Sequence, residues 1–173
     1  MSERIYRGNM ISIIASAFIL VELILVLING LQYLFSTTSK LLMWIIFILA
    51  LPSYITYSRS NLKKSFFMRV FGALAIVIAF AGLILIQLNQ FIGIETLILG
   101  YMFEPLAGIS IYLSLYNVNK LFSSLFFYGA LIYTIGLPMY LINLGIVSVA
   151  GDVIKMIGLF MLIMSFYTKR RVL

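Results

Sequence analysis

Four ionisable side chains lie inside long apolar segments of this chain: Glu22, Glu104, Asp152 and Lys155. An ionised group near the centre of a bilayer costs at least about 2–3 kcal/mol on insertion scales. Such groups therefore face the interior of a helix bundle and find partners there, and they often mark the path of an ion or a substrate. We take these four residues as the candidate functional residues of the chain.

The spacing around Glu104 indicates what could approach it. Gly100, Glu104 and Gly108 repeat every four residues, which places them on one face of a helix. Glycines at this spacing let a neighbouring helix come close. Glu104 is also followed directly by Pro105, which removes a backbone donor and frees a carbonyl in the preceding turn.

Lys155 lies in a similar setting. Gly151 precedes it by four residues and Gly158 follows it by three, while Asp152 is within i,i+3 reach. We therefore predict that the helices around residues 104 and 155 approach closely and that Glu104 and Lys155 form an ion pair. Such a pair could simply fix helix packing, or it could belong to a transport or ligand site, and the sequence leaves both interpretations open.

The elements that position these residues follow from composition. The chain has 173 residues, of which 64% are hydrophobic and 10% charged, and its mean hydropathy is +1.16. These values are typical of an integral membrane protein, and the apolar runs lack the period-two alternation of membrane β-strands. We predict an all-α bundle of six transmembrane helices forming a single membrane domain, residues 1–173. The predicted spans are 10–29, 41–57, 67–88, 92–116, 121–143 and 147–167, and Pro138 interrupts the fifth.

Lysines and arginines are distributed unevenly among the short connections, and this bias predicts orientation. With the N-terminus in the cytoplasm, ten of the twelve basic residues lie on the cytoplasmic side, so both termini are predicted to be cytoplasmic and the protein to lie in the cell membrane. These ten are Arg4, Arg7, Arg59, Lys63, Lys64, Arg69, Lys120, Lys169, Arg170 and Arg171.

Missing residue types exclude many kinds of chemistry. The chain has no Cys and no His, which excludes Cys/His zinc sites, His-ligated haem and Ser/His/Asp catalysis. We expect no cofactor and no metal. The formal net charge of +7 follows from the membrane-side bias, and no aromatic-basic motif accompanies it, so we expect no nucleic-acid partner.

The sequence thus predicts a non-enzymatic multi-pass membrane protein, either a transporter of a small solute or ion or the membrane subunit of a larger complex. The alternatives are a small membrane enzyme with carboxylate or Ser/Lys chemistry, such as Lys155 with Ser148, and a membrane sensor module. Predicted partners are the lipid bilayer, anionic headgroups at Arg59, Lys63, Lys64 and Arg69, and a membrane-protein partner or a second copy of the chain. A stripe of small residues, Gly72, Ala75, Ala79 and Gly82, is spaced for tight helix packing.

Overall fold

The computed structural model describes residues 3–171, with side chains to residue 168. Over this range it contains helices and no strands, which confirms the all-α prediction. Five of the six α-helices, all but α5, are long and apolar enough to cross a membrane. The elements are α1 (Glu3–Asn29), the short 3-10 helix η1 (Leu31–Phe35), α2 (Thr37–Ser58), α3 (Ser65–Gln87), α4 (Ile92–Leu115), α5 (Lys120–Gly136), the 3-10 helix η2 (Pro138–Ile142) and α6 (Ile146–Arg171).

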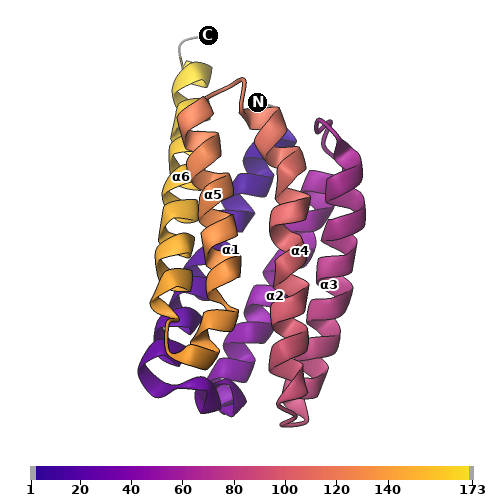
Figure 1. Cartoon of the computed structure of the whole chain (residues 1–173). Coiled ribbons are helices and arrows are strands. Elements are labelled where there is room, and N and C mark those ends of the chain that lie inside the picture. The colour runs from indigo at the N-terminus through magenta and orange to yellow at the C-terminus, as the bar shows by residue number, and fades with distance from the viewer. Residues whose placement is uncertain (1–2, 172–173) are drawn as a thin grey trace.

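The six α-helices form a closed ring. Each helix contacts the next one along the chain, and α6 returns to contact α1. In Figure 1, α6, α5, α4 and α3 follow one another across the view with α1 and α2 behind them, and α1 begins at the same end at which α6 finishes. A ring of six helices encloses an interior, and side chains from all six helices meet there.

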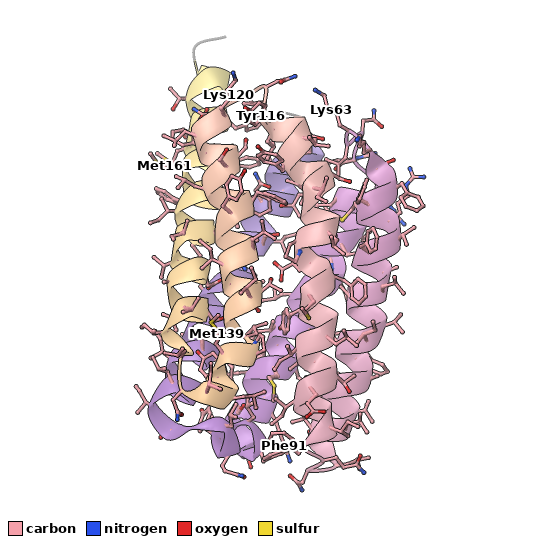
Figure 2. All side chains as sticks on the ribbon, viewed as in Figure 1. Lys63, Phe91, Tyr116, Lys120, Met139 and Met161 are labelled. Carbon is pink, nitrogen blue, oxygen red and sulfur yellow. The ribbon has the colours of Figure 1, made fainter. Side chains whose placement is uncertain are left out.

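The outer surface of the bundle carries many exposed apolar side chains, and a few charged side chains are buried inside it. Phe66 and Val77 are 64% and 65% exposed, whereas Asp152 and Lys155 are 0% and 2% exposed. Side chains project from the outer face of the bundle along its whole length (Figure 2). An apolar exterior that surrounds buried charges suits contact with lipid, and the protein is a multi-pass membrane protein.

The fifth predicted span is wrong in its last seven residues. Helix α5 ends at Gly136, and Pro138 occupies the first turn of η2. The reason is that Pro138 has no N–H to continue the ladder, and its ring collides with the preceding turn, whereas the first turn of a new helix needs no such donor. The 17 residues of α5 span about 26 Å, slightly less than a typical hydrocarbon core.

Glycines bring two antiparallel helix pairs into backbone contact. In the α5–α6 pair, a Cβ added to Gly151 would lie 2.1 Å from the backbone nitrogen of Tyr133, and one added to Gly158 would lie 2.3 Å from that of Phe126. In the α3–α4 pair, a Cβ on Gly100 would lie 2.8 Å from the nitrogen of Ala79. Backbones this close exclude any side chain at the glycine, so each pair is tightly packed.

These contacts correct the prediction that glycines bring the helices of residues 104 and 155 together. Gly100 packs on α3, while Gly151 and Gly158 pack on α5. A Cβ added to Gly108 would meet nothing within 4 Å, so this glycine is not needed for a close helix contact. The physical reason is that a glycine stripe permits close packing with any neighbouring helix. Because the connections are short, that neighbour is the helix directly before or after it in the chain.

Basic side chains gather at the end of the bundle that carries both termini. Figure 2 shows Lys63 and Lys120 at this end and Phe91 at the other. An exception is Lys40 near the opposite end, whose Nζ donates to Asn89 Oδ1 at 2.7 Å. The bundle therefore has one basic end, and the side of the membrane to which that end belongs stays a prediction.

Candidate functional site

A cavity of about 160 Å³ lies inside the ring, lined by side chains from all six helices. One apolar cluster, which includes Leu34 and Ile94, lies toward the end that carries η1. A second cluster, which includes Met68 and Leu115, lies toward the end that carries the termini. Since a water molecule takes about 30 Å³ in the liquid, the cavity has room for several waters or one small solute.

Two predicted residues, Glu104 and Lys155, line this cavity, and a third, Asp152, contacts Lys155 from outside the lining. Lys155 Nζ lies 2.8 Å from Asp152 Oδ1 and 3.6 Å from Glu104 Oε1. The ammonium also lies 4.4 Å from the centroid of the Tyr133 ring, which attracts it through the negative face of the ring. The structure thus brings Glu104 of α4 and Lys155 of α6 together without glycine-mediated contact between those helices.

The two carboxylates differ in their access to the cavity. Asp152 is fully buried. Within the described residues, the Lys155 ammonium is the only ion-pair partner of its carboxylate. The side chain of Glu104 is 39% exposed and lines the cavity. Asp152 is therefore the main counterion of Lys155, whereas Glu104 presents carboxylate surface to whatever occupies the cavity.

A row of hydroxyl groups forms another part of the cavity wall. Tyr57 Oη donates to Asn9 Oδ1 at 2.6 Å and accepts a longer bond from Ser12 Oγ at 3.4 Å. Because Ser12 donates to Tyr57, it accepts from Ser53 Oγ at 2.9 Å. Sequence reasoning missed these residues, although Ser12 and Ser16, like Ser53 and Tyr57, repeat every four residues within apolar segments.

Glu22 lies apart from the other three charges. It lines a separate cavity of about 80 Å³ closer to η1, and its Oε1 accepts a short hydrogen bond from Ser39 Oγ. A third cavity, of about 60 Å³, is lined by both Tyr101 and Glu104. Tyr101 lines the Glu22 cavity as well, so the three cavities follow one another through the interior of the bundle.

No family model matches this chain, and no curated protein or solved structure is significantly similar to it. Its site must therefore be understood from its own geometry. Within the described residues, no group of three or more Asp or Glu side chains could hold a metal ion together.

Pro105 and Gly108 lie beside the central cavity, whereas Pro138 does not. Helix α4 continues through Pro105, which removes the N–H that would otherwise bond to the carbonyl of Tyr101. Gly108 lines the cavity one turn beyond Glu104, and the missing side chain leaves open space there. Pro138 lies outside the site, at the start of η2.

Ser148 lies two turns before Lys155 and is fully buried. Its hydroxyl donates to the backbone carbonyl of Tyr133 at 2.8 Å. This bond joins α6 to α5, next to the glycine contacts of that pair.

Proposed function

We propose that the protein transports a small cation, a proton included, across its membrane, and that Glu104 binds this cation in the central cavity. One observation carries the proposal: an intramembrane carboxylate, accessible on one side, faces a cavity whose walls also carry hydroxyl groups. An ionised carboxylate at membrane depth that its partner does not enclose needs water or another cation beside it.

Lys155 supports this role because it behaves as an internal competitor for Glu104. Its 2.8 Å contact with Asp152 holds the ammonium in place, and the 3.6 Å contact with Glu104 is the weaker one. A cation that arrives in the cavity would bind Glu104 while Lys155 stays paired with Asp152. The buried lysine therefore never becomes an unpaired charge during the exchange.

A series of cavities supports a path toward the end that carries η1. A cavity of about 210 Å³ lies at that end and is lined by Tyr140 and Asn143. Tyr140 also lines the Glu22 cavity, which is linked through Tyr101 to the cavity beside Glu104. Toward the terminal end, the apolar cluster around Leu115 covers the site, so passage in that direction requires the helices to move.

The test compares Glu104→Gln with Glu95→Gln in proteoliposomes. Glu95 lies in the first turn of the same helix and is exposed, so its substitution is a matched control. We expect Glu104→Gln to abolish flux of protons or of small monovalent cations, and Glu95→Gln to retain it. Both variants should insert and elute as the parent does in size-exclusion chromatography. Normal flux through Glu104→Gln would contradict the proposal.

Other predicted properties concern the surface and remain proposals. Arg59, Lys63, Lys64 and Arg69 are all exposed at the basic end, where each could attract an anionic lipid headgroup by about 1 kcal/mol. A non-enzymatic role, a protein partner and the cell membrane as location stay predictions from the sequence.

A further inference from the structure

Glu22 is a buried carboxylate with a free oxygen. Its side chain lies in α1, and the residue is only 6% exposed. Oε1 accepts from Ser39, but Oε2 has no hydrogen-bond partner within the described residues. A buried carboxylate oxygen without a partner carries a large desolvation cost, which a bound cation would offset.

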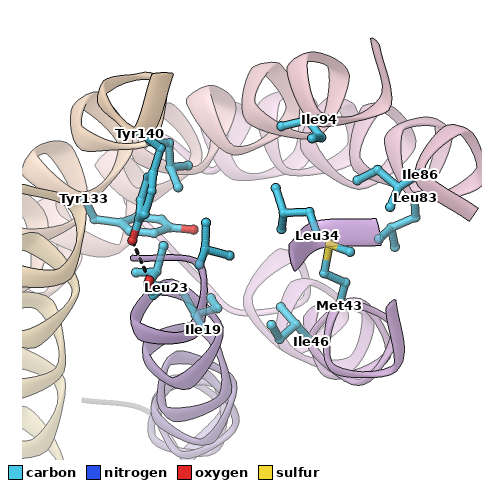
Figure 3. Packing of buried hydrophobic residues seen from close by; sticks show 12 residues of the cluster. Ile19, Leu23, Leu34, Met43, Ile46, Leu83, Ile86, Ile94, Tyr133 and Tyr140 are labelled. Carbon is cyan, nitrogen blue, oxygen red and sulfur yellow. Dashed lines mark hydrogen bonds between the residues drawn. The ribbon is translucent and has the colours of Figure 1, made fainter. Parts of the chain in front are cut away.

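Two tyrosines complete the polar surface of this cavity. Tyr101 and Tyr133 line it, and their rings pack edge to face with centroids 5.9 Å apart. Neither hydroxyl forms a hydrogen bond within the described part of the chain, whereas the nearby Tyr140 donates to the carbonyl of Leu23 at 2.7 Å. Figure 3 shows the Tyr133 side chain extending past Tyr140 toward the space between Leu23 and Leu34.

The chain already contains an example of how such groups bind a cation. Lys155 presents a primary ammonium to two carboxylates and to the ring of Tyr133. The Glu22 cavity offers the same elements, a carboxylate and tyrosine rings, together with two hydroxyl oxygens that can accept N–H bonds. It holds no ammonium group from the described chain, since Lys155 is occupied at the neighbouring site.

We propose that the Glu22 cavity is a second binding site, and that it takes a small primary ammonium ion such as methylammonium. The three N–H donors of methylammonium match the Glu22 carboxylate and the hydroxyls of Tyr101 and Tyr133 in number. A divalent metal ion would need about six oxygen ligands, more than this apolar cavity supplies. The volume of about 80 Å³ excludes bulky quaternary ammonium ions.

Binding at Glu22 stands independently of transport, and only the position of this site on a path through the bundle rests on the proposed function. The experiment therefore measures binding and not flux. Purified protein in detergent is unfolded thermally in methylammonium chloride, with sodium chloride and tetraethylammonium chloride at equal concentration as references. Methylammonium at ten times its dissociation constant is expected to raise Tm by about 3–6 °C.

Three variants make the result specific. Glu104→Gln keeps the Glu22 cavity and should show the same shift as the parent, even where its flux is lost. Glu22→Gln should show no shift. Tyr101→Phe preserves the packing and the carboxylate, and loss of one hydrogen bond to a charged group should weaken methylammonium affinity about tenfold.

The proposal is overturned if the parent shows no shift beyond that in sodium chloride, if Glu22→Gln shifts as much as the parent, or if tetraethylammonium stabilises equally. If Glu22→Gln does not fold, Tyr101→Phe decides: an unchanged methylammonium affinity in that variant overturns the site. Binding to a protein that carries no flux would support the Glu22 site and contradict the transport proposal alone.

Discussion

At the scale of single residues, Lys155 has two carboxylate partners with different tasks. Asp152 is fully buried and lies one helical turn away, so its 2.8 Å contact is supplied by the local geometry of α6. Glu104 comes from another helix and remains accessible from the cavity. We therefore expect stability to depend mainly on Asp152, and under the proposed function cation exchange would depend on Glu104.

This division predicts the effect of Asp152→Asn. Lys155 would keep only the 3.6 Å contact with Glu104, and a buried ammonium without its main counterion should lower the free energy of unfolding by about 3–5 kcal/mol. Denaturant unfolding of the detergent-solubilised protein measures this loss. Glu95→Gln, an exposed control, should change stability by less than about 0.5 kcal/mol. The double variant Asp152→Asn with Lys155→Met should recover most of the loss, and equal instability of the single and double variants would contradict the argument.

At the same scale, the sequence predicted which charged residues need partners better than it predicted what surrounds each of them. The cost of burying a charge is enough to predict that Glu104 and Lys155 seek partners, and the structure places them 3.6 Å apart. The cost of burying a charge does not say which helices surround Glu22. The hydrogen bond of Glu22 with Ser39 was therefore not predicted. Helical periodicity assigns a residue to a face, but the neighbour of that face depends on how the whole ring closes.

At the scale of elements, four of the six α-helices form two tightly packed pairs. Backbone contact through Gly100 joins α4 to α3, and contact through Gly151 and Gly158 joins α6 to α5. The central cavity lies between these pairs, and the ion pair of Glu104 with Lys155 connects them. Under the proposed function, binding of a cation by Glu104 would remove this connection and allow one rigid pair to move against the other.

Glycine substitutions test the tightness of these pairs. In Gly151→Ala the new Cβ would lie 2.1 Å from the nitrogen of Tyr133, so α5 and α6 must separate, and we expect a loss of about 1–3 kcal/mol. Gly108→Ala is the matched control, because its Cβ would meet nothing within 4 Å. Because alanine has a higher helix propensity than glycine, the free energy of unfolding of Gly108→Ala should be unchanged or higher by up to about 1 kcal/mol. Thermal unfolding in detergent compares the two, and equal destabilisation would contradict the packing argument.

Element boundaries followed from the sequence wherever apolar runs end in polar residues. The second and third spans were predicted within a few residues for this reason. The fifth was not, because the residues after Pro138 are as apolar as those before it. Hydropathy does not register the missing N–H of proline, and only backbone geometry reveals that the helix stops there.

At the scale of the whole molecule, the closed ring explains how a chain of this size can place charges inside a bilayer. Each polar side chain of the interior faces other helices, while lipid meets an apolar exterior. Six helices in sequence also return α6 to the end at which α1 begins (Figure 1). The termini therefore lie together, and the basic connections gather at the same end.

The composition of the chain makes its orientation in the membrane simple to test. Since the chain has no cysteine, a single introduced thiol reports one position without background. Asn61 lies in the connection before α3, at the basic end, and Gln90 lies in the connection after α3, at the other end; both are exposed. Basic connections stay in the cytoplasm during insertion, so Asn61 is expected on the cytoplasmic side.

A membrane-impermeant maleimide should therefore label Gln90→Cys in intact cells, and label Asn61→Cys only after the membrane has been permeabilised. The parent chain should remain unlabelled throughout. The reverse pattern would contradict the predicted orientation, and it would place the Glu22 cavity toward the cytoplasm and the covered end of the central cavity toward the outside. The direction in which a cation meets Glu22 before Glu104 thus depends on this one measurement.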